Sequence, residues 1–198
     1  MAQKWSNRNL PGALHFVTGN VLDRRQIFRT DKNCEAFLTV LQELREKMET
    51  KLCSFVLMPD HFHLVSNPRN GKIVEWTGAL KSLSAKTLTQ ICPVNWFIQP
   101  GGENQVWQES FKAFPLWSHW MIWQKVNYIH SNPIRAKLVV STKDYRWSSF
   151  HSIYGGTDDP LLQTDKDWRW PEDAEKLDKS MKEWSEERKQ KQRNSPLP

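Results

Sequence analysis

Two histidines alternate with a phenylalanine in the stretch Met58–Val65, which reads MPDHFHLV. Residues i and i+2 of a strand point to the same face, so His61 and His63 should share one face while Phe62 points to the other. Two imidazoles one strand step apart can bind a single divalent metal and leave positions open for a substrate. Two histidines that only hydrogen-bond within the fold would give the same pattern. Asp60 could orient an imidazole or could simply cap the turn before it.

A second group of reactive side chains lies in Tyr128–Val139, which reads YIHSNPIRAKLV. Tyr128 and Asn132 are four residues apart, so on a helix they project from the same side, one turn apart. A phenol and a carboxamide facing a metal would supply a nucleophile and a neutral ligand. Other large side chains continue the same helical stripe, so the spacing is equally compatible with a Tyr128 that is only a buried aromatic. His130 points elsewhere on such a helix and is interpreted as structural or surface.

Together with the later segment DYRWSSF, these two motifs resemble those of the REP-associated tyrosine transposases, a branch of the HUH-type single-tyrosine transposases. HUH denotes two histidines around a bulky hydrophobic residue, the place that Phe62 takes here. Shorter matches, HFVTGN, QIF and VWQESF, extend the resemblance from near the start of the chain to about Phe150. The resemblance implies a transposase that cleaves and rejoins single-stranded DNA at REP-type hairpins (repetitive extragenic palindromes).

Carried over to this sequence, the resemblance implies that His61, His63 and Asn132 bind Mg²⁺ or Mn²⁺ and that Tyr128 is the nucleophile. A free phenol, with a pKa near 10, is a weak nucleophile at neutral pH, and a metal on the scissile phosphate would assist its attack. Attack would give a 5′-phosphotyrosine and a free 3′-hydroxyl, and this linkage retains the phosphodiester energy, so strands could be rejoined without ATP. Imidazoles bind later transition metals more tightly, so the choice of Mg²⁺ or Mn²⁺ rests on the resemblance.

Basic residues are candidates for contacts to DNA phosphates. The implied partner is a single-stranded DNA hairpin, with no small-molecule cofactor and no membrane, and the chain would act as a monomer or homodimer. Arg135 and Lys137 are the most plausible phosphate contacts because they follow Asn132 closely. Lys81 and Lys86 fit a solvated helix face better. Tryptophans could also stack on unpaired bases, although most of the 11 should lie in the core. The candidate DNA-binding residues are Arg24, Arg25, Lys81, Lys86, Arg135, Lys137 and Arg146.

The net charge of +6 is unevenly distributed, with +8 in residues 1–157 and −2 in residues 158–198. A basic body favours a polyanionic partner, of which nucleic acid is the usual one. Three cysteines without a Cys-x-x-Cys pair argue against a disulfide framework or a zinc ribbon. No apolar run approaches the roughly 20 residues that span a bilayer, and the N-terminus has no secretory pattern. We therefore expect a cytoplasmic, nucleoid-associated protein.

Hydrophobic periodicity predicts an α+β fold with the order β-α-β-β-α-β, a ferredoxin-like antiparallel sheet with two helices on one face. The predicted strands cover 13–19, 52–58 and 61–67, with short strand-like pieces near 94–98 and 106–111. The predicted helices cover 31–51, 73–91 and 116–130, and the last is the catalytic-tyrosine helix. We assign residues 1–157 to an HUH single-tyrosine transposase domain and 158–198 to a charged, partly helical C-terminal tail. The inward side of the second helix is predicted to carry Ile73, Trp76, Leu80, Leu83 and Ile91.

Three functions remain compatible with these residues. The favoured one is a metal-dependent DNA strand-transferase that uses Tyr128. A catalytically inactive hairpin-DNA-binding protein on the same scaffold is the second. The third is a metal-dependent phosphodiester hydrolase, in which His61 and His63 activate water and Tyr128 is incidental. A covalent protein–DNA adduct that needs Tyr128 would separate the first from the other two.

Overall fold

Four strands form one antiparallel sheet at the centre of the computed structural model, which describes residues 7–92 and 105–193. The spatial order is β2-β3-β1-β4, and every neighbouring pair is antiparallel. With the helices included, the chain order begins β1-α1-β2-β3-α2-β4, as predicted. The α+β class and the antiparallel sheet are therefore confirmed. The strands are β1 (Leu14–Asn20), β2 (Thr50–Met58), β3 (His61–Pro68) and β4 (Lys112–Leu116).

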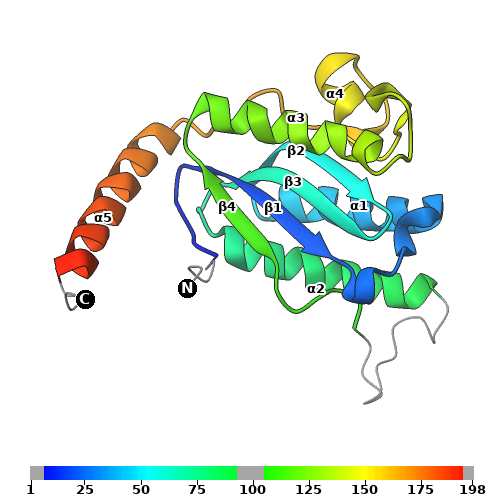
Figure 1. The fold of residues 1–198 in the computed structure, drawn as a ribbon, viewed down its shortest axis with the longest axis horizontal. Coiled ribbons are helices and arrows are strands. Elements are labelled where there is room, and N and C mark those ends of the chain that lie inside the picture. The colour runs from blue at the N-terminus through cyan, green and yellow to red at the C-terminus, as the bar shows by residue number, and fades with distance from the viewer. Residues whose placement is uncertain (1–6, 93–104, 194–198) are drawn as a thin grey trace.

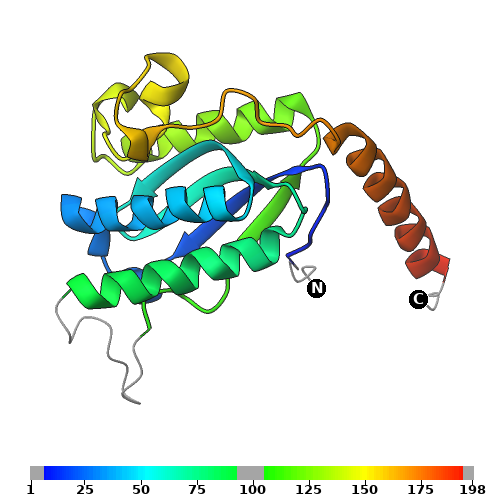
Figure 2. The ribbon, with the colours of Figure 1, turned by 180° about the vertical axis from the view of Figure 1, so that it is seen from behind.

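Helices cover both faces of this sheet (Figures 1 and 2). On one face, α1 (Asp31–Lys47) and α2 (Ile73–Ile91) pack on a core that includes Phe62 and Leu64 of β3. On the other face, α3 (His119–Arg135) packs through Val126 on a second core that includes Val65 of β3. The period-2 alternation of β3 therefore divides its side chains between two cores.

Local signals explain where the first two helices begin and end. The Thr30 hydroxyl accepts a hydrogen bond from the Asn33 backbone N–H at 3.4 Å and caps α1. The helix ends at Lys47 rather than near residue 51, because Thr50 already pairs with β3. The bounds of α2 match the prediction. Leu83 was wrongly placed inward: it is 45% exposed, and the inner stripe instead continues through the buried Ser84.

The fourth strand lies later in the chain than predicted. In the segment 106–111 the only strand-type pairing is an isolated bridge between Trp107 and Val21, and the strand itself is Lys112–Leu116. The other predicted piece, 94–98, lies outside the described residues. The third helix begins after Ser118, whose hydroxyl accepts from the Met121 N–H at 3.2 Å, and it continues through Pro133 to Arg135.

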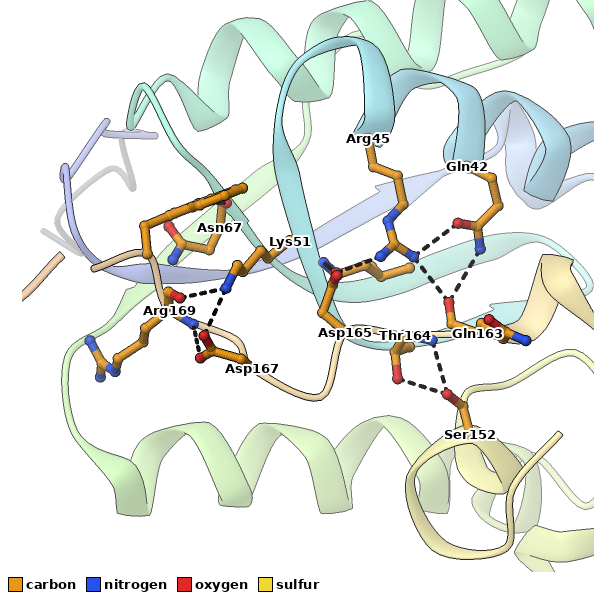
Figure 3. A network of polar contacts seen from close by, with 12 residues as sticks. Gln42, Arg45, Lys51, Asn67, Ser152, Gln163, Thr164, Asp165, Asp167 and Arg169 are labelled. Carbon is orange, nitrogen blue, oxygen red and sulfur yellow. Dashed lines mark hydrogen bonds and ion pairs between the residues drawn. The ribbon is translucent and has the colours of Figure 1, made fainter. Parts of the chain in front are cut away.

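The segment after residue 157 runs along the outer edge of β2 before α5 (Asp173–Arg193) begins (Figure 3). The Asp165 N–H donates to the Leu52 carbonyl at 2.9 Å, and the Asp165 carboxylate accepts from the Leu52 N–H at 2.7 Å. Arg45 pairs with the same carboxylate at 2.5 Å. This segment covers an edge strand that would otherwise expose unpaired backbone groups. The domain division at 157/158 stays a prediction.

Short helices complete the described chain, and α4 (Phe150–Tyr154) lies beside the far end of α3 in Figure 1. None of the helices within 7–92 and 105–193 has the length and apolar character that crossing a bilayer requires. The 3-10 helices span Leu22–Arg24, Ile27–Arg29, Thr142–Asp144 and Pro160–Leu162.

Candidate active site

His61 and His63 lie on the face of β3 that α3 covers, while Phe62 between them packs on α1. The predicted division of these three side chains between the two faces is confirmed. The two imidazole centroids are 4.8 Å apart and the rings are nearly perpendicular, at 80°. His61 is half-buried, and His63 is 6% exposed. The strand therefore presents two imidazoles side by side.

Each imidazole is held through its Nδ1 atom. The Asp60 carboxylate is 2.5 Å from His61 Nδ1, and the Thr18 hydroxyl is 2.7 Å from His63 Nδ1. Asp60 thus orients an imidazole, one of the two roles considered for it. Within the described residues, the Nε2 atoms of both rings have no hydrogen-bond partner. In the tautomer whose Nδ1 carries the proton and donates to Asp60 or Thr18, the Nε2 lone pair of each ring is available to a ligand.

Burial keeps both rings neutral near pH 7. Burial lowers the pKa of His63 to about 3, and the charges of His61, Arg24 and Lys125 act in the same direction. Burial also lowers the pKa of His61, although its hydrogen bond to Asp60 opposes that shift. Neutral imidazole is the form that binds metal, so the protonation state suits coordination.

Tyr128 of α3 is brought against this pair. Its ring centroid lies 5.3 Å from that of His63 and 5.8 Å from that of Phe16. Phe16 itself stacks on His63 at 5.3 Å. The Tyr128 side chain is half-buried, so it is neither sealed in the interior nor turned away from the imidazoles. Two cations flank the phenol ring: Lys125 Nζ is 5.6 Å and the Arg135 guanidinium carbon 5.5 Å from its centroid.

Asn132 lies one turn after Tyr128 on the same helix, as its spacing predicts. Its amide Nδ2 donates to the Tyr128 carbonyl at 2.7 Å, and within the described chain its Oδ1 has no hydrogen-bond partner. No group of three or more His, Cys, Asp or Glu in the described residues could hold a metal. A third protein ligand beside His61 and His63 would therefore be a neutral oxygen such as that of Asn132. Two imidazole nitrogens, joined by an amide oxygen such as that of Asn132, would suit a divalent cation that keeps open positions.

Three of the predicted DNA-binding residues lie near the site. Arg24 pairs with Asp60 at 2.9 Å, directly behind His61. Arg135 lies over the Tyr128 ring, and the exposed Lys137 follows it with a backbone φ of 57°.

The other four predicted residues lie elsewhere. Lys81 and Lys86 are on α2, on the opposite side of the sheet from Tyr128, and Lys81 donates to two backbone carbonyls at 2.7 and 2.9 Å. Arg25 pairs with Asp23 at 3.0 Å. Arg146 lies 3.7 Å from each of three carboxylates, those of Asp31, Glu35 and Asp159.

Sequence reasoning missed three residues of the site, Thr18, Phe16 and Lys125. Lys125 is three residues before Tyr128, so its helical spacing could have found it. Thr18 is identified only by the pairing of β1 with β3, which sets it directly opposite His63. His130 is 4% exposed and its Nε2 is 2.9 Å from the Ser149 hydroxyl, so it is structural.

Three of the matches between this chain and known proteins bear on its family and fold. The model of a family described as "Transposase IS200 like" matches residues 13–132, a span that contains both histidines, Tyr128 and Asn132. A protein of Haemophilus influenzae, assigned by name to the REP-associated tyrosine transposases, is 29% identical over 148 residues, 71% of this chain and 81% of that protein. A solved REP-associated tyrosine transposase bound to a REP hairpin superposes with a TM-score of 0.62 at 19% identity, over 85% of this chain and 97% of that one. The last match shows that the two chains share a fold.

Proposed function

This chain belongs to the IS200-like transposase family, and from that premise we propose that it cleaves and rejoins single-stranded DNA through a covalent bond to Tyr128. The observation that carries the proposal is the distance of 5.3 Å between the ring centroids of Tyr128 and His63, whose partner His61 is 4.8 Å away. The proposed nucleophile and the two imidazoles proposed to bind the metal come from distant parts of the chain, and their rings are neighbours.

The proposed reaction is a transesterification at phosphorus. The Tyr128 phenol oxygen attacks the scissile phosphate, a bond forms between that oxygen and phosphorus, and the bond to the 3′-oxygen breaks. The products are a 5′-phosphotyrosine and a 3′-hydroxyl, and the proton that the phenol loses is balanced by the proton that the 3′-oxygen takes up through solvent. Attack by a 3′-hydroxyl on the phosphotyrosine reverses the step and rejoins a strand.

The neighbouring residues support this chemistry. His61 and His63, with the Asn132 amide, would hold Mg²⁺ or Mn²⁺, which when bound polarises the scissile phosphate and stabilises the charge of the transition state. Thr18 and Asp60 keep the imidazoles oriented through Nδ1.

Positive charge lies beside the phenol. Lys125 and Arg135 are both within 5.6 Å of the centroid of the Tyr128 ring, where they would attract a phosphate to the nucleophile. These two cations come from the same helix as Tyr128, so the helix presents nucleophile and charge together.

The proposed substrate is a single-stranded DNA hairpin of the REP type. Support comes from the names of the two relatives, of which the solved one binds a REP hairpin. Arg24 and Arg135 are the leading phosphate contacts among the predicted residues, because Arg24 pairs with Asp60 beside His61 and Arg135 lies over the Tyr128 ring. Lys137 follows Arg135 by two residues and is exposed. The assembly state and a cytoplasmic, nucleoid-associated location stay predictions.

A covalent-adduct assay tests the proposal. The full chain is incubated with a labelled single-stranded hairpin oligonucleotide and Mn²⁺, and the products are separated on a denaturing gel. We expect a protein–DNA band that disappears with Tyr128→Phe, which removes only the hydroxyl, and with chelation of the metal. Tyr145→Phe is the matched control, because its hydroxyl donates to the Leu57 carbonyl in the interior and takes no part in the proposed chemistry.

The same gel separates the two other functions. Hairpin binding without an adduct or cleavage would show an inactive DNA-binding protein. Cleavage that survives Tyr128→Phe would show a hydrolase in which His61 and His63 activate water. Either result would overturn the proposal that the chain is a strand-transferase.

A further inference from the structure

An aromatic strip leads away from Tyr128 over β1 and β4, at the edge of the core that α3 covers. In Figure 1, α3 lies over β2 and β3, whereas β4 forms the opposite edge of the sheet. Phe16 of β1 and Phe114 of β4, both partly buried, are direct cross-strand partners. Side chains at such paired positions lie next to each other on one face.

The strip continues beyond β4. The ring of Phe114 stacks on Trp117 at a centroid distance of 6.2 Å, and Trp117 in turn lies 6.2 Å from Trp184 of α5. Trp117 is 37% exposed, although a large indole is usually well buried. We name this surface the aromatic strip. Its members are Tyr128, Phe16, Phe114, Trp117 and Trp184.

Positive charge borders the strip. Lys125 Nζ lies 4.9 Å from the centroid of the Phe16 ring. Lys112 is exposed on β4 directly opposite Thr18, two residues before Phe114 and therefore on the same face. Trp117 is the exposed member of the strip, and the other four rings are partly buried. An accessible aromatic ring near lysines is the combination that binds single-stranded nucleic acid, because bases stack on the ring while the ammonium groups attract the phosphates.

We propose that the aromatic strip binds unpaired bases of the DNA strand that carries the scissile phosphate, with Trp117 as the main stacking platform. The inference rests on the proposed function, since the strip begins at the nucleophile and continues without a break to Trp117. A hairpin cleaved near its foot has a single-stranded flank, and the strip gives that flank a path from Tyr128 toward β4 and α5. The occupant is therefore single-stranded DNA rather than the duplex stem.

The test measures binding without chemistry. In a Tyr128→Phe background with no divalent metal, fluorescence anisotropy gives the affinity for three ligands: a hairpin with a single-stranded flank, a blunt hairpin, and a flanked hairpin with abasic sites in the flank. Alanine replacement of a stacking aromatic costs about 1–3 kcal/mol per base, so Trp117→Ala should weaken binding of the flanked hairpin about 5- to 150-fold. Its affinity for the blunt and abasic ligands should stay within about twofold of the parent protein.

Trp123→Ala is the matched control. Trp123 is also 37% exposed and lies on α3, which begins two residues after Trp117, but its ring contacts Trp168 at 5.3 Å rather than a member of the strip. Its replacement should leave all three affinities unchanged. Trp117→Leu separates stacking from apolar contact: we expect it to lose affinity like alanine, whereas Trp117→Phe should retain most of it.

Two results would overturn the inference. One is parental affinity of Trp117→Ala for the flanked hairpin, or an equal loss for the blunt one. The other is a self-associating parent protein that Trp117→Ala converts to a monomer in sedimentation, which would make the strip an interface between copies. Failure here is distinct from failure of the proposed function. If Tyr128 forms an adduct but Trp117→Ala binds the flanked hairpin as the parent does, only the proposal for the aromatic strip is wrong. If Trp117→Ala weakens binding as expected but no adduct forms at Tyr128, only the proposed chemistry is wrong.

Discussion

Tyr128 meets His63 ring to ring, with centroids 5.3 Å apart and planes inclined at 66°. The two residues are 65 positions apart in sequence and reach each other because α3 packs on the sheet through a buried stripe that includes Val126 and Ile129. The catalytic geometry proposed for this chain therefore depends on how firmly β3 and α3 are held. Substitution of the residues that orient the imidazoles should therefore weaken metal binding while leaving the fold intact.

Thr18→Val tests the hydrogen bond that orients His63. Valine keeps the β-branched shape but removes the hydroxyl that lies 2.7 Å from His63 Nδ1. Loss of such a supporting bond lowers metal affinity about 10- to 100-fold. We expect the Mn²⁺ concentration for half-maximal adduct formation to rise by about that factor, with a similar maximal yield at saturating Mn²⁺.

Thr39→Val is the control for that substitution. The Thr39 hydroxyl donates to the Glu35 carbonyl on the exposed side of α1, far from the imidazoles in the fold. Its replacement should leave the Mn²⁺ titration unchanged. An unaltered titration for Thr18→Val as well would show that the hydroxyl does not position His63.

Gly19→Ala tests the close approach of β1 to the residue between the two histidines. A Cβ at Gly19 would lie 2.4 Å from the Phe62 ring, far inside van der Waals contact. Phe62 is 1% exposed and packed on Phe37, so it has no room to move aside. We expect a loss of about 1–3 kcal/mol in the free energy of unfolding, measured by urea denaturation.

The same substitution should also reduce adduct formation by the molecules that remain folded, because strain at Phe62 shifts His61 and His63 on either side of it. Gly78→Ala is its counterpart: it lies inside α2 and a Cβ there meets no atom within 4 Å. That change should stabilise the chain by about 0.5–1 kcal/mol. If Gly19→Ala and Gly78→Ala changed the free energy of unfolding equally, the close approach of β1 to Phe62 would be refuted.

Local patterns in the sequence were sufficient for part of the fold and part of the site. The bounds of α2 follow from Asn70-Gly71 before it and Pro93 after it, and the alternation in β3 places His61 and His63 on one face. These features depend on neighbouring residues alone. The functional roles assigned to Tyr128 and Asn132 rest on the family resemblance, since their helical spacing also fits a buried aromatic.

The remaining features depend on partners distant in sequence. Ser84 occupies an inner position that the pattern assigned to Leu83, and it is accommodated because its hydroxyl donates to the Leu80 carbonyl and accepts from Trp107 Nε1. Segment 106–111 alternates like a strand, yet β1 pairs with the residues after it, including Pro115 on an edge strand. No local pattern contains that pairing, or the contact of Thr18 with His63.

Asp165→Ala tests the segment that covers β2 (Figure 3). The Asp165 carboxylate pairs with Arg45 at 2.5 Å and accepts from the Leu52 N–H at 2.7 Å, and only 29% of its side chain is exposed. Its loss leaves the Leu52 N–H without this carboxylate and leaves a poorly solvated guanidinium with only the Gln42 side chain and the Gln163 carbonyl as acceptors. We expect about 1–3 kcal/mol of destabilisation, a fall of several degrees in Tm.

Asp167→Ala is the matched control in the same segment. Asp167 also forms an ion pair, with Lys51 at 3.0 Å, but 80% of the Asp167 side chain is exposed, so water screens the pair. Calorimetry should show a much smaller shift in Tm for Asp167→Ala than for Asp165→Ala. If the two variants have the same Tm, the segment is not anchored through Asp165.

His15 gives the fold a defined pH dependence. It is fully buried on β1, and within residues 7–92 and 105–193 neither ring nitrogen has a hydrogen-bond partner. Burial lowers its pKa to about 4, and the nearby backbone of Ala13 and Arg8 offsets this only in part. In the unfolded chain the ring titrates near pH 6.5, so between about pH 6.5 and 4 the unfolded state binds one more proton.

The stability that neutral His15 contributes is therefore fully present above pH 6.5 and is lost as the pH falls toward 4, by about 3 kcal/mol in total. Burial of His130, whose pKa is also lowered to about 4, acts with the same sign. His15→Leu removes one of these protons, so the free energy of unfolding should fall by about 1.4 kcal/mol less per pH unit than in the parent chain. Urea denaturation at a series of pH values between 7 and 4 measures both slopes, and identical slopes would show that His15 is already protonated in the folded state.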